Sequence, residues 1–232
     1  MMSKQGTRKQ EVPRVAKKIP PAKRRDADLA YDAIETMIIT LTLPPGTLVV
    51  ESELLERTGI GRTPVREALM RLMSSGLLIQ QPRRGLLVSP IDLADHLDVI
   101  QTRLVLEQLI AACAARRSTA AQRAEILAQV EKMTAAAERD DLAAYTRADH
   151  DRATVFYAAS RNISAVTAVK PLVTQSRRFW HAYQHAGQMR EGVVFHRQIA
   201  NGVASGNEAE AIAGATALMN YLEAFTRCVI DG

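Results

Sequence analysis

The chain contains 232 residues, of which 47% are hydrophobic and 24% are charged. This length corresponds to one large domain or two small ones, and the apolar content is sufficient for a core, which excludes a wholly disordered protein. No apolar run approaches the roughly 20 residues of a membrane helix. The charged start at Lys4, Arg8 and Lys9 lacks the apolar stretch of a secretory signal. We therefore expect a soluble cytoplasmic protein with no membrane partner.

The cysteine content excludes two further classes of protein. Cys113 and Cys228 are the only cysteines, and they form no C-x-x-C pair. This argues against a disulfide framework and against a thiolate zinc site. We expect both side chains to be buried thiols.

The net charge of +5 is concentrated in residues 1–25. This segment carries a net charge of +8, whereas residues 26–90 carry −2 and residues 91–232 carry −1. Because it contains three prolines and few apolar residues, we expect a disordered basic tail. Two roles remain open: a solubilising leader, or an arm that binds DNA phosphates without sequence preference.

Residues 26–90 are expected to form a compact head that begins with two helices. Apolar residues recur at helical spacing over Ala27–Leu43. The Pro44-Pro45-Gly46 sequence after them is expected to end this helix. A short helix follows over Glu51–Arg57 and is closed by Gly59.

A third helix is expected from residue 62, with Gly61 as its N-cap and Pro64 in its first turn. Helix, glycine-containing turn and helix form the pattern of a helix-turn-helix. At 100° per residue, one face of the third helix is apolar and the opposite face is basic. The apolar face contains Val65, Ala68, Leu69 and Leu72, and the opposite face contains Arg62, Thr63, Arg66 and Met70.

A β-hairpin is expected after Gly76. Two short apolar runs, Leu77–Gln81 and Leu86–Ser89, flank a Pro-Arg-Arg-Gly sequence. A basic hairpin tip of this kind can lie against phosphates or the minor groove. This makes the head a winged helix-turn-helix, with Arg84 and Gly85 as the wing contacts.

The head resembles the DNA-binding domain of the GntR family of bacterial transcription regulators. The resemblance rests on "GRTPVREAL" followed by "LMSSGLL" and covers residues 30–90. It implies Arg62, Thr63 and Arg66 as operator contacts and Gly85 as the wing glycine. A position in the second helix that is arginine in some members is Ser52 here, so the operator sequence cannot be carried over from them.

Residues 91–232 are expected to be all-helical. Alanine is abundant, strand-like alternation is absent and the connections are short, which favours an antiparallel bundle. The fold class is therefore mainly α, a winged helix-turn-helix followed by a bundle. The expected helices are Asp92–Arg117, Thr119–Glu138, Leu142–Arg161, Ala165–His185, Glu191–Ser205 and Glu208–Ile230.

This half is similar to the C-terminal domain of the FadR-type branch of the GntR family. The stretches "TRLVLEQLIAACAA", "YAASRN" and "FHRQIANGVASGN" carry the similarity. It implies a domain, residues 91–232, that binds an effector and forms a homodimer. In many relatives an arginine at the position of Arg103 is a pocket residue.

Arg103 and Glu107 lie one turn apart, which allows two interpretations. They can form a simple i, i+4 ion pair worth about 0.3 to 0.5 kcal/mol. Alternatively, Arg103 points into the bundle and binds the carboxylate of a small acid with its planar guanidinium.

The resemblance also suggests a site for a divalent metal ion. Many relatives bind a metal through an aspartate, a histidine four residues later and two later histidines. Asp149 and His196 match two of these ligands, but Ala153 stands four residues after Asp149, and Leu218-Met219-Asn220 replaces the last histidine. Two of the four ligands are absent, so no metal is assigned. We keep both residues as weak metal candidates.

The remaining polar candidates are assigned to an effector pocket. Inward polar residues in a bundle are costly unless they have partners. The set is Arg103, Asp149, Tyr157, Arg178, His196 and Asn220. The aromatic run over residues 177–185 is interpreted as core or pocket lining rather than a nucleic-acid surface.

The sequence thus predicts a ligand-responsive transcription regulator, a repressor of a metabolic operon that responds to a small organic acid. Its partners are a double-stranded DNA operator, a carboxylate effector and a second copy of the chain. The alternative is an architectural DNA-binding protein without an effector. An enzyme is disfavoured, because the chain lacks a phosphate-binding glycine loop, a G-x-S-x-G elbow and an H-E-x-x-H motif.

Overall fold

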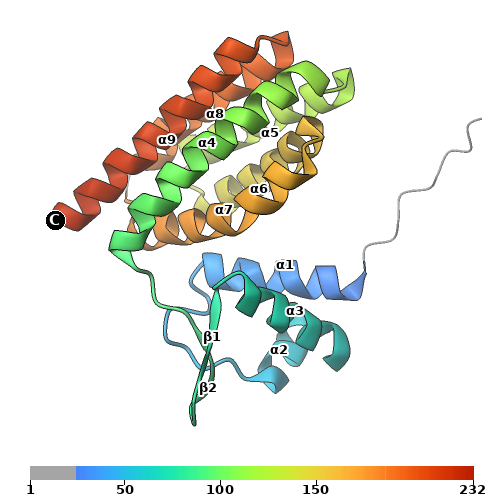
Figure 1. The fold of residues 1–232 in the computed structure, drawn as a ribbon, viewed down its shortest axis with the longest axis vertical. Coiled ribbons are helices and arrows are strands. Elements are labelled where there is room, and N and C mark those ends of the chain that lie inside the picture. Colours follow the sequence, from blue (N-terminus) through green and yellow to red (C-terminus); the bar gives the residue numbers. More distant parts are fainter. Residues whose placement is uncertain (1–24, 186) are drawn as a thin grey trace, which may run out of the picture.

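The computed structural model describes residues 25–185 and 187–232 (Figure 1). The predicted basic tail therefore lies, except for Arg25, outside the described residues. The described chain contains two separate hydrophobic cores, one in the head (residues 26–90) and one in the helical domain (residues 91–232). The mainly α architecture predicted from the sequence, a winged helix-turn-helix followed by a helical domain, is confirmed.

The head consists of three helices and a two-stranded sheet. Gly59 ends the second helix with a φ of 66°, and Gly61 is the N-cap of the third. Both roles were predicted from the sequence. The elements are α1 (Asp26–Ile39), α2 (Glu51–Thr58), α3 (Arg62–Ser74), β1 (Leu78–Gln81) and β2 (Gly85–Val88).

Helix α1 ends at Ile39, earlier than the predicted Leu43. The chain leaves the helix at Thr40, and Leu41 adopts a left-handed conformation with a φ of 58°. This turn directs the buried Leu43 back to the head, where its amide donates to the carbonyl oxygen of Met37 at 2.9 Å. Burial of Leu43, rather than the prolines after it, thus explains the earlier end.

The hairpin completes the winged helix. Strands β1 and β2 are antiparallel, with Leu78 opposite Val88 and Gln81 opposite Gly85. On α3, the four predicted core residues, Val65, Ala68, Leu69 and Leu72, are buried. They pack against α1 and β1 and hold the opposite face of α3 outward.

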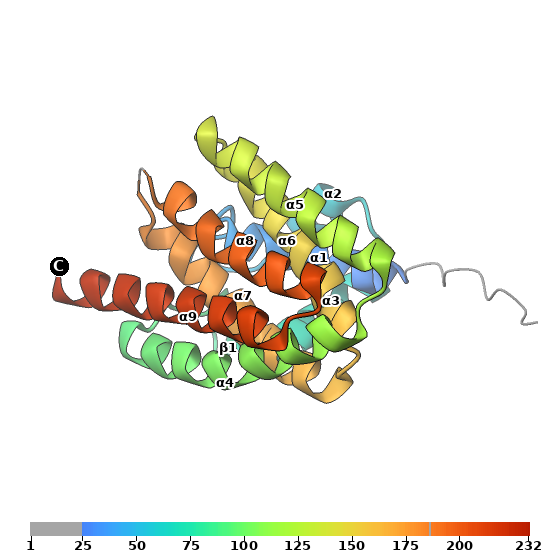
Figure 2. The same ribbon diagram turned by 90° about the horizontal axis from the view of Figure 1, so that it is seen from above.

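The helical domain contains the six predicted helices, with ends within three residues of those expected. Side-chain caps explain where five of the six helices begin: Asp92, Thr119, Asp141, Asn162 and Asn207 each accept from a backbone amide of the helix that follows. Helix α4 contacts α6, α7, α8 and α9, and α5 packs against α6 and α8. Figure 2 shows α4 along one edge of the domain, with α9 beside it. The elements are α4 (Leu93–Arg117), α5 (Ala120–Glu138), α6 (Leu142–Ser160), α7 (Ile163–Tyr183), α8 (Gln188–Ser205) and α9 (Glu208–Asp231).

Helix α7 connects the helical domain to the head. In Figure 1, α1 lies beneath it, and the two helices are in contact. The Thr174 hydroxyl donates to Glu35 Oε1 at 2.8 Å. The Arg178 guanidinium donates to the Ser89 hydroxyl at 3.0 Å and to the Ser89 carbonyl oxygen. Both the first helix of the head and the segment that leaves the wing are therefore bound to α7.

Two further expectations concern the environment of the chain. None of the helices in the described ranges combines the length and the apolar character required to cross a membrane. Cys113 is buried as predicted, but Cys228 is exposed. The prediction for Cys228 was wrong because it lies on a solvent-facing side of the last turns of α9, between the exposed Arg227 and Ile230.

Candidate DNA-binding surface and effector cavity

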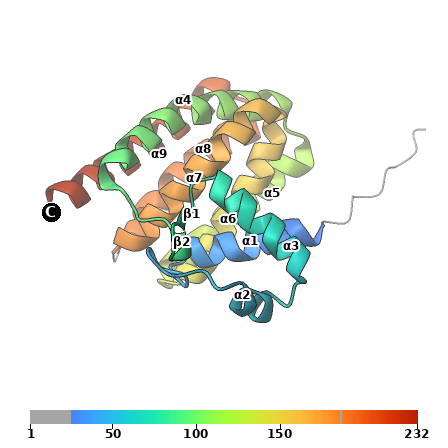
Figure 3. The same cartoon turned by 60° about the horizontal axis from the view of Figure 1, so that its bottom comes forward.

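The reading face of α3 (Arg62, Thr63, Arg66 and Met70) is exposed along its whole length. The side chains of Arg62 and Arg66 are 68% and 62% exposed. Figure 3 brings this side of the head forward: α2 and α3 lie on the side of α1 away from the helical domain. The guanidinium groups are therefore accessible on the surface of the chain, which major-groove binding requires.

Glu51, the first residue of α2, binds both arginines of the reading face. Its Oε1 lies 3.1 Å from Arg62 Nε, and its Oε2 accepts from Arg66 Nε at 2.7 Å. Ser52, the next residue, is exposed. The α2 N-terminus thus orients the reading face, a role for Glu51 that the helical pattern of the sequence did not indicate.

The tip of the wing is basic and exposed. Arg83 adopts a φ of 65° and Gly85 a φ of 93°, which lets the chain reverse between the strands. A Cβ atom added at Gly85 would lie 3.3 Å from Leu48 Cδ1, so glycine also leaves room for that side chain. Arg84 points outward and donates to Gln81 Oε1 at 3.4 Å.

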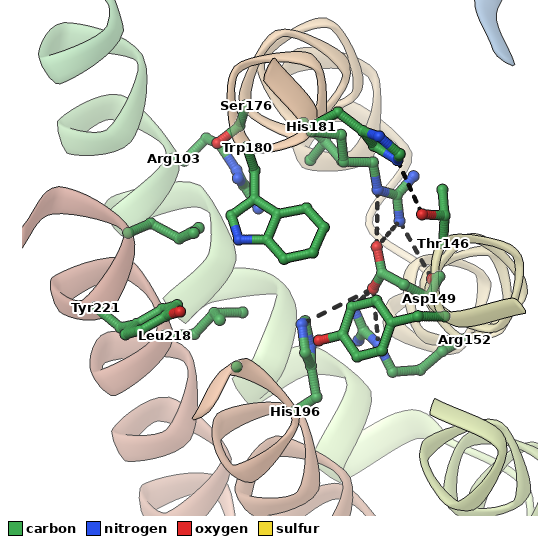
Figure 4. A pocket seen from close by; sticks show the side chains of 15 residues that line it. Arg103, Thr146, Asp149, Arg152, Ser176, Trp180, His181, His196, Leu218 and Tyr221 are labelled. Carbon is green, nitrogen blue, oxygen red and sulfur yellow. Dashed lines mark hydrogen bonds and ion pairs between the residues drawn. The ribbon is translucent and has the colours of Figure 1, made fainter. Parts of the chain in front are cut away.

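A cavity of about 80 Å³ lies inside the helical domain, between α4, α6, α7, α8 and α9 (Figure 4). Polar groups gather on the side of α6 and α7, and apolar groups on the side of α9. The lining residues are Arg103, Tyr145, Thr146, Asp149, Arg152, Val173, Ser176, Arg177, Trp180, His181, Gly192, His196, Leu218, Tyr221 and Leu222.

Asp149 is held by two arginines at the wall of the cavity. Its Oδ1 accepts from Arg152 Nη2 at 2.8 Å, and its Oδ2 accepts from Arg177 Nε at 2.8 Å. Burial alone would raise the pKa of this carboxyl, but the charges of Arg177 and Arg152 outweigh it and hold the pKa well below its usual range. The two arginines therefore hold Asp149 in its carboxylate form.

Arg103 lines the cavity and also forms the predicted ion pair with Glu107. Its Nη2 donates to Glu107 Oε1 at 3.0 Å, and the Tyr157 hydroxyl donates to the same oxygen at 2.8 Å. The Arg103 side chain is only 7% exposed, and its Nε has no hydrogen-bond partner among the described residues. One edge of this guanidinium is thus bound, and a second donor remains buried beside the cavity.

His196 also lines the cavity and is neutral there. Burial, followed by the charge of Arg152, lowers its pKa to about 3. Its Nε2 lies 4.0 Å from Asp149 Oδ1, and its Nδ1 is buried without a partner. A neutral imidazole can donate through one nitrogen and accept through the other.

The residues present do not fit the divalent metal site that the resemblance raised. Both oxygens of Asp149 are bound to guanidinium groups, whose charge repels a cation. Across the described residues, no group of three or more His, Cys, Asp or Glu side chains is placed to hold a metal ion. Asp149 and His196 therefore remain residues of the cavity wall.

The structure brings together three of the six predicted effector residues, Arg103, Asp149 and His196. The other three do not line this cavity. The Tyr157 hydroxyl donates to Glu107, the Arg178 guanidinium donates to Ser89, and Asn220 is exposed on the outer side of α9. Successive residues on a helix are about 100° apart, so Arg177 and Tyr221 line the cavity in place of their neighbours Arg178 and Asn220.

Sequence reasoning also missed cavity residues on α6. Arg152 stands three residues after Asp149, a helical spacing that indicates contact. Trp180 and His181 belong to the aromatic run that was correctly interpreted as packing or pocket lining. No local pattern indicated Tyr145, which reaches the cavity from α6.

Comparison with known proteins divides the chain into the same two domains, the head and the helical domain. Residues 27–88 match the family described as "Bacterial regulatory proteins, gntR family", and residues 98–221 match the FCD domain. An uncharacterised HTH-type transcriptional regulator of Agrobacterium vitis is 36% identical over 124 residues, which cover 52% of this chain and 72% of the relative. The HTH-type transcriptional repressor RspR of Escherichia coli is 30% identical over 48% of this chain, and the match spans only 49% of RspR.

A solved structure supports the fold over nearly the whole chain. E. coli McbR/YncC superposes with a TM-score of 0.77 at 18% identity, covering 90% of this chain and 100% of that one. The relatives are transcription regulators rather than enzymes. The chain therefore belongs to the GntR family, as a DNA-binding transcription regulator with a C-terminal FCD domain.

Proposed function

We propose that the protein is a repressor of a metabolic operon that binds a pseudo-palindromic operator as a homodimer and is released by a small organic acid. Arg62, Thr63 and Arg66 read the major groove, with Ser52 beside them on α2. Arg84 and Gly85 at the wing contact the backbone or the minor groove. RspR is named a repressor, and this supports the direction of regulation.

One observation carries the proposal: the effector cavity and the head share helix α7. Arg177 and Trp180 line the cavity, while Thr174 and Arg178 on the same helix bind Glu35 and Ser89. A ligand changes operator affinity only if its own affinity differs between the two arrangements of the heads. A ligand that shifts α7 also changes the contacts to the head, so its affinity differs between the two arrangements.

A homodimer sets the geometry of the operator. Two-fold symmetry places two α3 helices in successive major grooves about 34 Å apart. The effector then acts by changing the spacing of the two heads. The protein acts in the cytoplasm, where bacterial DNA is accessible.

The test begins with an operator selected from random duplexes by the full-length protein. We expect Arg66→Ala to weaken binding to this operator by about 1 to 3 kcal/mol, measured by fluorescence anisotropy, if Arg66 contacts a base. Arg227→Ala is the matched control, because Arg227 is an exposed arginine near the end of α9. Equal losses on operator and random DNA would make Arg66 a phosphate contact.

Removal of residues 1–25 separates this function from architectural DNA binding. We expect the truncated protein to keep its sequence preference and to lose part of the salt-dependent affinity that the +8 segment supplies. If the truncated protein loses its sequence preference together with the salt-dependent affinity, the head is not the part that recognises the operator sequence. The basic tail is then the DNA-binding element.

A further inference from the structure

Arg177 of helix α7 borders two separate spaces. One is the cavity inside the helical domain, and the other is a groove of about 840 Å³ between the head and the helical domain. The groove is lined by α1 and α3 of the head and by α6 and α7 of the helical domain. Val173, one turn before Arg177, also borders both spaces. This turn of α7 therefore separates the cavity from the groove.

On the cavity side, Arg177 is held by Asp149. Its Nε donates to Asp149 Oδ2 at 2.8 Å, and its Nη2 lies 2.6 Å from the same oxygen. Nη2 also donates to the Asp149 carbonyl oxygen at 3.2 Å. The third nitrogen, Nη1, makes no hydrogen bond to a described residue. The guanidinium thus keeps one donor for a second partner.

On the groove side, Glu35 of α1 faces the same turn of α7. Its Oε1 accepts from the Thr174 hydroxyl at 2.8 Å, and Thr174 and Arg177 stand three residues apart, on one side of the helix. Burial alone would lower the pKa of the Arg177 guanidinium, but the charges of Asp149 and, more weakly, Glu35 raise it above its usual range. Glu35 Oε2 accepts no hydrogen bond from a described residue. An unbound donor and an unbound acceptor therefore border the groove from the two domains.

Glu35 is also connected to helix α3. Its Oε1 accepts from the Tyr31 hydroxyl at 3.0 Å, and the Arg71 guanidinium of α3 lies over the Tyr31 ring, 4.4 Å from its centroid. Arg71 also donates to Asp28 of α1 at 2.8 Å. A change in the position of Glu35 is therefore transmitted to the helix that carries the reading face.

We propose that Arg177 is a switch between Asp149 and Glu35. In the structure, the guanidinium is bound to Asp149. A cavity ligand that breaks this pair frees the guanidinium to bind Glu35 across the groove, and the new ion pair fixes the head against α7. This inference rests on the proposed effector function and specifies how the cavity acts on the head. The ligand shifts the equilibrium only as far as it binds the second arrangement more tightly.

The exchange leaves no buried charge without a counterion. Arg177 is paired with a carboxylate in both arrangements, and Asp149 keeps Arg152, whose Nη2 donates to its Oδ1 at 2.8 Å. A buried ion without a partner would make one arrangement strongly unfavourable. Because neither arrangement contains one, a ligand of ordinary affinity is sufficient to shift the balance.

Asp149→Asn in the full-length protein tests the switch without a ligand. The substitution removes the charge that holds Arg177 at the cavity, so the guanidinium turns to Glu35. We expect affinity for the selected operator, measured by fluorescence anisotropy, to fall three- to tenfold, as it does with an effector bound. Asp151→Asn is the matched control with unchanged affinity, because it removes an exposed carboxylate of the same helix that also lines the groove.

Glu35→Gln is then combined with Asp149→Asn. The glutamine carbonyl oxygen still accepts from Tyr31 and Thr174, but it has no charge to bind Arg177. We expect the double variant to return to within twofold of the parent affinity, whereas Asp149→Asn combined with Asp151→Asn stays weak. A merely structural loss at Asp149 would not be restored by Glu35→Gln, so an unrestored affinity overturns the switch.

Hydrogen–deuterium exchange measures the docking of the head directly and requires no operator. We expect the amides of α1 to exchange at least threefold more slowly in Asp149→Asn than in the parent, and as in the parent when Glu35→Gln is added. Because Asp149→Asn weakens the pairing of two buried arginines and costs stability, Glu35→Gln is also measured alone. It removes the attraction for Arg177 and keeps both hydrogen bonds, so exchange in α1 becomes two- to fivefold faster.

The outcomes separate this inference from the proposed function. Exchange in α1 that is unchanged by Glu35→Gln, alone and with Asp149→Asn, overturns the switch. Unchanged operator affinity in Asp149→Asn also overturns it, while the repressor function, tested by Arg66→Ala, stands. If no operator is selected, the proposed function fails, and the exchange of α1 still decides whether Arg177 passes from Asp149 to Glu35.

Discussion

Glu51 binds Arg62 and Arg66, the two arginines that we propose for DNA recognition. All three side chains are at least partly exposed, so each pair is worth at most about 1 kcal/mol in water. The phosphate backbone and base edges of DNA can therefore compete for the guanidinium groups. The carboxylate holds the arginines in position and also repels the phosphates.

We expect Glu51→Gln to raise affinity for random DNA by up to about fivefold. The change removes a negative charge next to the reading face, and the loss of a surface pair corresponds to no more than about 1 kcal/mol. Anisotropy titrations at two salt concentrations measure the effect, with Glu56→Gln on the exposed side of α2 as control. Weaker binding would instead show that Glu51 is needed to orient the arginines.

His96 gives the protein a pH-dependent stability. Its ring stacks on Phe179 with a centroid distance of 3.8 Å, and burial, with the charge of Arg103, lowers its pKa from 6.5 to about 4. The unfolded chain therefore binds a proton below pH 6.5 that the folded chain does not bind until pH 4. The stabilisation is fully present above pH 6.5 and is lost as the pH falls towards 4.

We expect the melting temperature to fall between pH 7 and pH 5 and this fall to be smaller in His96→Phe. One pKa unit corresponds to about 1.4 kcal/mol, so each buried neutral histidine costs on the order of 2 kcal/mol at pH 5. His196 contributes with the same sign, so part of the slope persists. Calorimetric scans at both pH values measure the melting temperature of each protein. An identical slope in the parent and in His96→Phe would contradict the role of His96.

At the scale of elements, α8 and α9 approach closely through two glycines. A Cβ atom added at Gly202 would lie 2.3 Å from the backbone nitrogen of Ala211, and one added at Gly214 would lie 2.7 Å from that of Ile199. Both neighbouring atoms belong to helix backbones, which cannot rotate away as a side chain can. The wall of the cavity formed by α8 and α9 depends on this contact.

Gly202→Ala is expected to destabilise the helical domain by about 1 to 3 kcal/mol or more, because the two helices must separate to admit a methyl group. For a protein of this size, this corresponds to a loss of roughly 2 to 4 °C in melting temperature per kcal/mol. Thermal unfolding of Gly202→Ala is compared with that of Ala209→Ser, an exposed position on α9. An unchanged melting temperature would show that the helices move apart freely.

At the scale of the whole molecule, the two domains are joined by polar contacts on α7. Thr174 binds Glu35 on α1, and Arg178 binds Ser89 at the end of the wing. Val173, Ser176 and Arg177 on the same helix face the cavity. Under the proposed function, a ligand that displaces α7 therefore changes both contacts to the head.

We expect Thr174→Val, which removes the hydrogen bond to Glu35, to reduce the effect of a ligand on operator affinity. Coupling energies between sites are typically 1 to 3 kcal/mol, so losing one of two contacts should reduce the response several-fold. Operator affinity is measured with and without a small organic acid that binds the protein, and Thr167→Val on the exposed side of α7 is the control. A full response in Thr174→Val would exclude this contact from the coupling.

The sequence by itself determined the kinds of elements and much of the exposed surface that we propose for DNA binding. Proline, glycine and apolar spacing act locally, so they predicted α2, the turn at Gly59 and the buried and exposed faces of α3. The six helices of the second domain followed from the same local rules. Reading the end of α1 from its prolines failed, because the burial of Leu43 depends on the rest of the head.

Only the tertiary structure decided which side of each long helix meets the cavity. A rotation of 100° exchanges Arg177 with Arg178 and Asn220 with Tyr221, and over helices of this length the apolar pattern is too broad to fix that angle. The pairing of Asp149 with Arg177 joins residues 28 positions apart on two helices, and no local spacing encodes it. The electrostatic character of the cavity follows from that packing and was therefore not predictable from the sequence.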